Sequence, residues 1–381
     1  MIPYSTQSIT AAEIAAVTEV LTSGWLTQGP AVPRFEARVA ALHQAKHAVA
    51  LSSATAGLHL GCLALGVGAG SRVWTSPISF VASANCAAYC GAEVDFVDIE
   101  PETANLSVEA LAHKLEAAER DGCLPDVLVP VDYAGQPADL AQMRTLADRY
   151  GFSLLEDASH ALGATFDGEP IASRHTDLTV FSFHPVKIIT TGEGGMVVTQ
   201  DTLLSERLQR LRSHGVTRDP AQLQAVPPGD WYYEQTELGF NYRMTDIQAA
   251  LGCVQLDRLP GFQRTRRQLA QRYDVLLRGL PVQPLLRRTD RDSSLHLYPV
   301  RLHAGIDRAD AFARLRSQGI GVQVHYIPIH LQPYWRAKGF RPGDFPEAEA
   351  YYESTLSLPL YPAMTEEQQD VVVQRLAEIL T

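Results

Sequence analysis

The strongest constraint on the fold of this chain is a repeated alternation between short apolar stretches and stretches with helical periodicity. It begins near residue 47 with HAVALSS followed by TAGLHLGCLALG, and it continues until FSLLED ends at residue 157. Two more apolar stretches, DLTVFSFH and GMVVT, follow at 177–184 and 195–199. Short buried strands separated by helices are typical of a mostly parallel sheet that helices cover on both faces. The sequence therefore predicts an α/β fold around such a sheet.

Helical patterns flank this alternation on both sides. Thr10 and Glu13 have the spacing of a capping box at the start of a helix over 10–23, in which Ile14, Val17 and Leu21 line one apolar face. After residue 200 the pattern is mostly helical, and a second capping box opens a helix over 244–259. A further helical face follows at 267–280.

The last third of the chain has a mixed pattern. Strands are expected at 294–302 and 320–326, among three helical stretches. At 381 residues the chain exceeds one average domain. We expect a large α/β domain over 1–260, with the N-terminal helix, and a linking helix with a smaller α+β domain over 261–381.

Composition excludes several classes of protein. The formal charge is −11 and no Lys/Arg block is present, which argues against nucleic-acid binding and against an anionic membrane surface. The N-terminus lacks a secretory pattern, and no stretch reaches the roughly 18 apolar residues of a membrane span. The five cysteines show no metal-binding spacing, and those at 62, 86 and 253 fall in apolar helical patterns, as small buried hydrophobes would. A cytoplasmic enzyme or binding protein is the expectation.

Lys187 is the first residue with possible chemistry. It follows FSFH at a predicted strand end and precedes TTGEGG, and no acidic residue lies nearer in the sequence than Glu193. Most lysines are surface residues, which is the alternative here. Open sheets, however, hold ligands beyond the carboxyl ends of their strands. A lysine in a dry site of this kind is a candidate for a Schiff base.

Asp157 in LLEDASHALG is the second candidate. It ends a run of buried residues at the carboxyl end of a strand. Its side chain could cap a following helix, or it could hold a positive charge on a ligand ring. Because the predicted strands are neighbours, Asp157 and Lys187 can face one crevice.

Two further strand ends complete the set. LSSATAGLHL starts a helix at Ala54 and Thr55 with small residues whose amides can bind an anion, and Ser182 could add a hydroxyl. In TSPISFVASAN, Phe80 is either a core residue or a flat face for an aromatic ligand. Pyridoxal phosphate (PLP) requires an anion seat, a stacking ring, a carboxylate for its pyridine nitrogen and a lysine for its aldehyde. The set therefore predicts a PLP site.

With these residues, the chain resembles the DegT/DnrJ/EryC1/StrS sugar aminotransferases from about Ile2 to the C-terminus. The similar segments include SSATAGL, EDASHALGA, FSFHPVK, TTGEGG and YYEQTELGFNYRMTDIQAALG. The resemblance implies the PLP-dependent aspartate aminotransferase fold (fold type I). SPISFVASAN, VDYAG, SHALG and QVHY are most similar to the branch that makes UDP-4-amino-4,6-dideoxy-N-acetyl-β-L-altrosamine for pseudaminic acid, rather than to the perosamine, desosamine or aminoarabinose branches.

The resemblance also implies roles for individual residues. Lys187 and Asp157 would be catalytic, and Asn241 would reach the cofactor phosphate of a neighbouring subunit in a homodimer with shared sites. The residues implied to contact PLP are Ala54, Thr55, Phe80, Asp157, His160, Ser182, Lys187 and Asn241. The family's substrates would be L-glutamate and a nucleotide-linked keto sugar. The candidates for sugar contact are Tyr4, Thr27, Gln28, His184, Arg243, His325, Tyr326 and His330, of which the His/Tyr group in HYIPIH could equally be structural.

Two other functions fit parts of the pattern. A nicotinamide-dependent sugar oxidoreductase would share the sheet, but it requires GxGxxG after the first strand, where this chain has SSATAG. A PLP-bound sensor would keep the pocket without turnover. Family dehydratases carry histidine in place of the lysine, so Lys187 favours transamination. Another nucleotide-linked 4-keto sugar, of the GDP-perosamine or dTDP-amino sugar type, is the alternative substrate.

Overall fold

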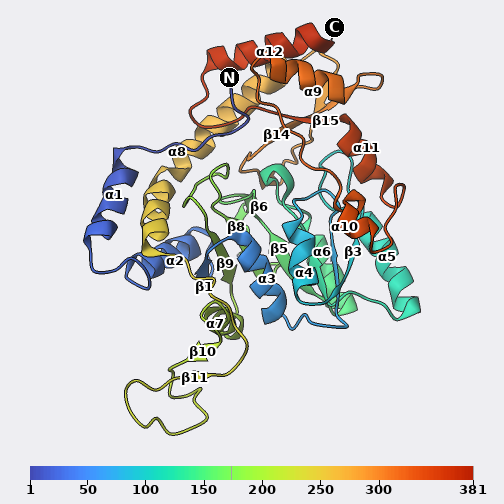
Figure 1. Cartoon of the computed structure of the whole chain (residues 1–381). Helices are drawn as coiled ribbons and strands as arrows, with labels where there is room; N and C mark the ends of the chain where they lie inside the picture. The colour runs from blue at the N-terminus through green and yellow to red at the C-terminus, as the bar shows by residue number, and fades with distance from the viewer. Residues whose placement is uncertain (173, 381) are drawn as a thin grey trace.

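The computed structural model describes residues 1–172 and 174–380, and a seven-stranded sheet forms its centre (Figure 1). In sheet order the strands are β1 His47–Leu51, β9 Gly195–Thr199, β8 Leu178–Ser182, β5 Ser153–Asp157, β4 Val127–Val129, β2 Arg72–Thr75 and β3 Glu93–Phe96. Strands β8, β5, β4, β2 and β3 are parallel to one another, and β9 runs antiparallel to both β1 and β8. The prediction of a mostly parallel sheet is confirmed.

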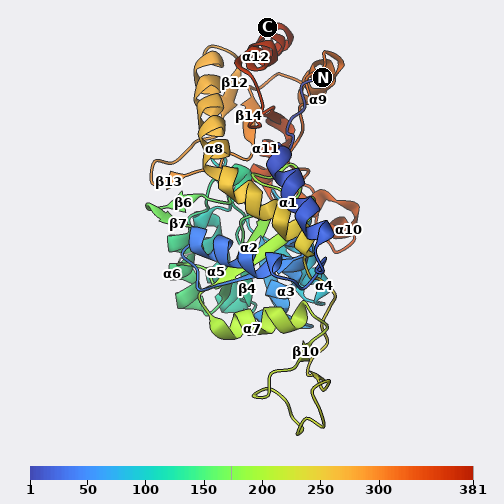
Figure 2. The same ribbon diagram turned by 90° about the vertical axis from the view of Figure 1, so that its left-hand side faces the viewer.

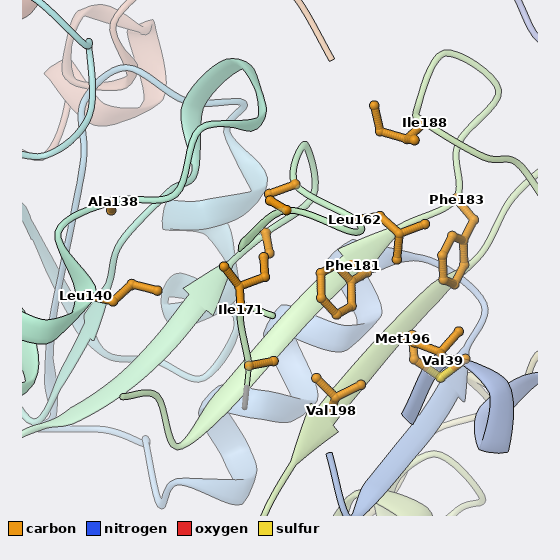
Figure 3. Close-up of a cluster of buried hydrophobic side chains, with 14 of the residues drawn as sticks. Val39, Ala138, Leu140, Leu162, Ile171, Phe181, Phe183, Ile188, Met196 and Val198 are labelled. Carbon is orange, nitrogen blue, oxygen red and sulfur yellow. The ribbon is translucent and has the colours of Figure 1, made fainter. Parts of the chain in front are cut away.

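Helices cover both faces of this sheet. One face packs against α3 Ala54–Ala64, α4 Ala82–Tyr89 and α7 Thr202–Leu211. The other packs against α2 Ala31–Leu42, α5 Val108–Asp121, α6 Leu140–Tyr150 and α8 Asp246–Leu276. Figure 3 shows Phe181 and Phe183 of the β8 segment beside Met196 and Val198 of β9 in this second core. Val180, the residue before Phe181, belongs to the first core, as the alternation of side chains along a strand requires.

Both predicted capping boxes are present, but the first helix buries a different face from the one expected. In α1 Ala11–Thr22, Thr10 caps the helix and Glu13 is its buried residue. The side chains of Ile14 and Leu21 are 62% and 55% exposed. The apolar residues therefore do lie on the helix with the expected spacing, but this chain leaves Ile14 and Leu21 largely exposed.

Helix α8 corrects a second expectation. The patterns at 244–259 and 267–280 belong to one helix of 31 residues, which continues through Pro260. Its N-terminal part packs on the sheet, and Leu269 and Tyr273 in its C-terminal part belong to a separate core with Val300 and Leu356. Because the helix crosses residue 260 without a break, the division into domains at that position stays a prediction.

The C-terminal part is built around a small antiparallel sheet. Its strands are β12 Val282–Pro284, β14 Tyr298–Leu302 and β15 Thr355–Leu358. The surrounding helices are α9 Arg308–Ser317, α10 Pro333–Arg336, α11 Pro346–Ser354 and α12 Glu366–Leu380, with a short 3₁₀ turn at Ile329–Leu331; another such turn, Tyr133–Gly135, follows β4. The chain's first residues join this part through a bridge between Ile2 and Ile320.

The strand expected at 320–326 does not form. Only Ile320 and Gln323 make isolated bridges there, and the following residues leave the sheet toward the centre of the molecule. Apolar alternation predicted a strand because Ile320, Val322 and Val324 are apolar. The segment meets β15 only through the isolated bridge of Gln323, and His325 and Tyr326 line the cavity.

Two small sheets complete the fold. One contains β13 Arg291–Asp292, β6 Thr165–Phe166 and β7 Glu169–Pro170, and the other is a hairpin of β10 Val216–Thr217 and β11 Glu234–Gln235. Figures 1 and 2 show that this hairpin and its loop extend away from the body as an arm. Among residues 1–172 and 174–380, no helix combines the length and apolarity needed to cross a bilayer.

Gly195 provides a test of how the sheet meets α3. A Cβ at Gly195 would lie 2.4 Å from the Ser53 carbonyl carbon and 2.5 Å from the Ala54 nitrogen, which are rigid backbone atoms. We expect Gly195→Ala to lower the free energy of unfolding by about 1–3 kcal/mol, as overpacking does. Urea denaturation measures it, with Gly68→Ala as the control because a Cβ there meets nothing within 4 Å. Equal stability of the two variants would contradict this close approach.

Candidate active site

A cavity of about 630 Å³ lies at the carboxyl ends of the parallel strands. Asp157 ends β5, Ser182 ends β8, and α3 begins just after β1. Of the predicted site residues, the cavity is lined by Tyr4, Ala54, Thr55, Phe80, Asp157, His160, Ser182, His184, Lys187, His325 and Tyr326. The cavity wall thus combines the strand ends of the seven-stranded sheet with residues 323–326, which leave the small C-terminal sheet.

Lys187 lies in the loop after β8 and is half-buried in the cavity wall. Its backbone N–H donates to the His184 carbonyl in a turn at 2.9 Å. Across residues 1–172 and 174–380, no carboxylate lies within the 4.0 Å of an ion pair with its amine. Desolvation lowers the pKa of Lys187 from 10.5 to about 8, and the charge of Asp157 opposes this shift only in part. The amine is therefore readily available in its neutral, nucleophilic form.

Asp157 is held by hydroxyl groups from two sides. The Ser83 hydroxyl of α4 donates to Oδ2 at 2.6 Å, and the Ser159 hydroxyl donates to Oδ1 at 2.5 Å. No helix begins after Asp157, since residues 158–163 form turns, so the interpretation as a helix cap is wrong. The carboxylate is fixed in the cavity wall, where it can pair with a cationic ring nitrogen.

The start of α3 forms an anion seat. Ser53 caps the helix by accepting the Ala56 N–H at 3.1 Å. The amides of Ala54 and Thr55 lie in the first helical turn, where no acceptor exists within the helix. Both residues line the cavity with Ser182, whose hydroxyl can donate to the same anion. This arrangement suits a phosphate group.

Phe80 is not a core residue, so that interpretation is also wrong. Its side chain is 59% exposed and lines the cavity, with its ring centroid 6.3 Å from that of Tyr326. An aromatic ligand ring could therefore stack on it.

Three histidines form the far wall of the cavity. His160 Nε2 lies 3.2 Å from the Tyr326 hydroxyl, and His325 Nδ1 lies 2.8 Å from the Ser357 hydroxyl. The ring of His296 lies 4.4 Å from that of His160. Burial lowers the pKa of His325 to about 3 and holds those of His160 and His296 well below their usual value. All three imidazoles are thus neutral hydrogen-bonding groups at physiological pH.

Several cavity residues escaped the sequence analysis. His296, Gln323 and Ser79 line the cavity, and Ser83 holds Asp157 from the next helix turn after Phe80. The small residues of SPISFVASAN were a signal for Ser83, because a serine three positions along a helix shares the face of Phe80. His296 had no local signal, since it lies inside an apolar strand pattern.

Five predicted contacts lie outside the cavity. His330 is fully buried, with Nε2 2.9 Å from a Glu349 carboxylate oxygen and its ring against Phe345, so its expected sugar contact is wrong. Packing against aromatic side chains gives this histidine a structural position. Thr27, Gln28 and Asn241 are exposed, and Arg243 is half-buried beside Leu51. The contacts predicted for these four residues stay predictions.

The residues present fit PLP. The cavity offers an anion seat at one strand end, an exposed aromatic face at another, and a carboxylate and a neutral amine at two more. His160 adds a buried Nδ1 that has no hydrogen-bond partner among the residues that the structure describes, as expected of a group that awaits a ligand.

Comparison with known proteins agrees with this fit. The sequence profile of the DegT/DnrJ/EryC1/StrS aminotransferase family matches residues 7–377. The chain belongs to this family. It is 39% identical over 386 residues to the spore coat polysaccharide biosynthesis protein SpsC of Bacillus subtilis, with 100% of this chain and 97% of that protein aligned.

Solved structures of similar proteins share the whole fold. Helicobacter pylori PseC, described as an aminotransferase of pseudaminic acid biosynthesis, superposes with a TM-score of 0.90 at 30% identity over 100% of this chain and 99% of that chain. Spr1654 of Streptococcus pneumoniae in its PMP form gives 0.91 at 31% identity with the same coverage, and Spr1654 also has a PLP form. This DegT/DnrJ/EryC1/StrS member is thus a PLP-dependent sugar aminotransferase with the aminotransferase fold.

The lowered pKa of Lys187 gives a pH prediction. At neutral pH an amine with a pKa of about 8 has roughly two orders of magnitude more neutral form than an ordinary lysine. We expect the rate of PLP uptake by the apoenzyme, followed by absorbance, to rise with pH and to level off above about pH 8. A rate that continues to rise to about pH 10 would contradict the desolvated amine.

Proposed function

We propose that this enzyme moves the amino group of L-glutamate to C-4 of a nucleotide-linked 4-keto-6-deoxy sugar. The proposed substrate is UDP-2-acetamido-2,6-dideoxy-β-L-arabino-hexos-4-ulose, in pseudaminic acid biosynthesis. The full-length similarity to PseC supports this choice. So do the phrases SPISFVASAN and QVHY, which contribute Phe80 and His325 to the cavity wall.

One observation carries the proposal. Lys187 and Asp157 come from different strand ends but line the same cavity, and the charge of Asp157 acts on the Lys187 amine. A structural lysine would have a carboxylate partner or free access to water. A half-buried amine with neither is suited to covalent bonding with an aldehyde.

Each residue would then have a defined task. Bound PLP supplies an aldehyde that carries the amino group and a ring that takes up electron density from the reacting carbon. Lys187 would hold the cofactor covalently at rest, and its released amine would move the proton to and from Cα of glutamate. Asp157 would keep a proton on the ring nitrogen, because a charge-assisted hydrogen bond favours the cationic ring.

The remaining wall would bind and orient. The amides of Ala54 and Thr55 and the Ser182 hydroxyl would hold the phosphate, and Phe80 would cover one face of the ring. His160 would lie near the ring hydroxyl. The sugar would contact Tyr4, His184, His325 and Tyr326, which line the cavity away from α3.

A substrate panel tests the proposal. The purified enzyme, charged with glutamate, would be offered UDP-, GDP- and dTDP-linked 4-keto sugars, with amino sugar formation followed by mass spectrometry. We expect the UDP-linked N-acetyl sugar to react fastest. Bound PLP whose absorbance does not respond to glutamate would indicate a sensor and contradict the aminotransferase.

A second candidate substrate is another nucleotide-linked 4-keto sugar for a surface polysaccharide. SpsC, at 39% identity, takes part in spore coat polysaccharide biosynthesis, and its full length aligns with this chain almost completely. Preference for a dTDP- or GDP-linked sugar in the panel would select this candidate.

We also propose a cytoplasmic homodimer with shared sites. The uncovered apolar residues Ile14 and Leu21 of α1, and Trp231 of the arm, which is 72% exposed, suit burial by a second copy. Asn241 follows the arm and is exposed outside its own cavity, as a residue that reaches a neighbouring site would be. The five cysteines are free, which suits a reducing compartment.

Mixing two inactive variants tests the shared site. In a mixed dimer of Lys187→Ala and Asn241→Ala subunits, one site would contain both changes and the other would contain neither. After random exchange we expect about a quarter of wild-type activity, because half the dimers are mixed and each has one intact site. If Asn241 acts within its own subunit, mixing will restore nothing.

Replacing Asp157 tests its electrostatic task. We expect Asp157→Asn to fold, because the isosteric amide can accept from one of the two hydroxyls of Ser83 and Ser159 through its oxygen and donate to the other through its NH2 group. Transamination should fall roughly 10²-fold or more, since the ring nitrogen loses its ionic partner. Single-turnover kinetics with glutamate measures this loss. Wild-type rates would mean that Asp157 is only structural.

A further inference from the structure

Two buried carboxyl groups lie directly behind the site. Asp132 follows β4 and Glu156 precedes Asp157 in β5, and neither is accessible to solvent. Because successive strand residues point to opposite faces, Glu156 points away from the cavity that Asp157 lines. The two groups act on each other electrostatically, and each has one buried oxygen that no hydrogen-bond donor of the described residues reaches.

Each carboxyl group accepts a hydrogen bond from another residue through only one of its two oxygens. Asp132 Oδ1 accepts the Ala138 N–H at 2.9 Å, and Glu156 Oε2 accepts the Thr179 hydroxyl at 2.5 Å. Asp132 Oδ2 and Glu156 Oε1 are buried and have no hydrogen-bond partner in the part of the chain that the structure describes. Two carboxylate oxygens cannot hydrogen-bond unless one of them carries a proton.

If Asp132 and Glu156 were both ionised, no cation among the described residues would pair with the second negative charge. From β8, Thr179 donates to Glu156 and is itself 2.8 Å from the Thr176 hydroxyl. The charge that acts on both groups is that of Asp157, which is also negative. Arg291 of β13 reaches the loop after Asp132, but it pairs there with Asp139 and Asp290.

We propose that Asp132 and Glu156 share one proton and that this acid–carboxylate pair positions Asp157. The proposal deepens the proposed function, since it concerns the residue that would hold the cofactor ring. The Asp132 N–H donates to the Asp157 carbonyl at 3.1 Å, and the Asp157 N–H donates to the Pro130 carbonyl at 2.8 Å. The shared proton closes this link on the opposite face, so the ends of β4 and β5 are joined on both sides of Asp157.

The pair should make stability depend on pH. Burial is the largest effect on both groups: it raises the pKa of Glu156 to about 7 and that of Asp132 well above its usual value. The native state therefore keeps a proton that the unfolded chain releases above about pH 4. The stability this proton gives is complete at low pH and is lost as pH rises through about 7.

Variants with isosteric amides distinguish a shared proton from a pair that only fills space. In Glu156→Gln or Asp132→Asn, an amide N–H replaces the shared proton and the pair keeps a single negative charge. In urea denaturation of the holoenzyme, we expect the ratio of wild-type to Glu156→Gln folding constants to fall about tenfold per pH unit between about pH 5 and 7. If the free energies of unfolding of the wild type and of Glu156→Gln change with pH in the same way, the proposal is overturned.

Infrared spectroscopy reads the proton directly. At neutral pH the wild type should show a carbonyl band of a buried protonated carboxyl group that is missing from both amide variants. Asp246→Asn should keep the band, because both Asp246 oxygens already accept backbone N–H groups at 2.8 Å. A band that survives in both amide variants, or is absent from the wild type, would overturn the shared proton even if Glu156→Gln folds poorly.

A pH profile tests the positioning of Asp157. With glutamate alone, the ratio of single-turnover rates at about pH 9 to those at pH 7 should be several-fold higher in Glu156→Gln, whose pair cannot lose a proton. If the wild type and Glu156→Gln have the same ratio of rates, the pair does not position Asp157. Denaturation and infrared readouts need no turnover, so failure of the proposed function would leave them able to decide the shared proton.

Discussion

The desolvated amine of Lys187, facing Asp157 across one cavity, is the interaction on which the rest of the site depends. Burial shifts the Lys187 amine toward its neutral, nucleophilic form, and the Asp157 carboxylate adds a negative charge to the wall of the same cavity. The amine and the carboxylate can face the same cavity only if the two strand ends from which they come lie side by side. Strands β5 and β8 are adjacent and parallel, so their last residues, Asp157 and Ser182, open at the same edge.

The same geometry explains why the fold tolerates polar groups in its interior. The start of α3 supplies free amides where β9 passes so closely that only glycine fits at residue 195. Behind Asp157, the proposed proton between Asp132 and Glu156 would let two carboxyl groups be buried at the cost of one charge. This proton would couple function and stability at the end of β5, because Glu156 and Asp157 lie on opposite faces of the same strand.

Much of this arrangement was predictable from the sequence, because it depends on local periodicity. The order of short apolar stretches predicted the central sheet, and the strand ends predicted that Lys187, Asp157, Phe80 and Ala54 lie together. Where the predictions failed, distant contacts decided the structure. Alternation at 320–326 reflected burial against a cavity, and Pro260 did not interrupt α8, which packs along two cores. No local pattern could reveal that His296 would face His160. The exposed face of Ile14 marks a further limit, since an apolar face that its own chain leaves uncovered looks like core in the sequence.

The location of the covalent bond to the cofactor tests the central claim most directly. Borohydride reduction of the resting holoenzyme would fix the cofactor to whichever amine holds it, and peptide mapping by mass spectrometry would identify that residue. We predict a pyridoxyl group on Lys187 and none on the other lysines of the chain, Lys46, Lys114 and Lys338. A label on any of those three, or no label on a protein that retains PLP, would contradict it.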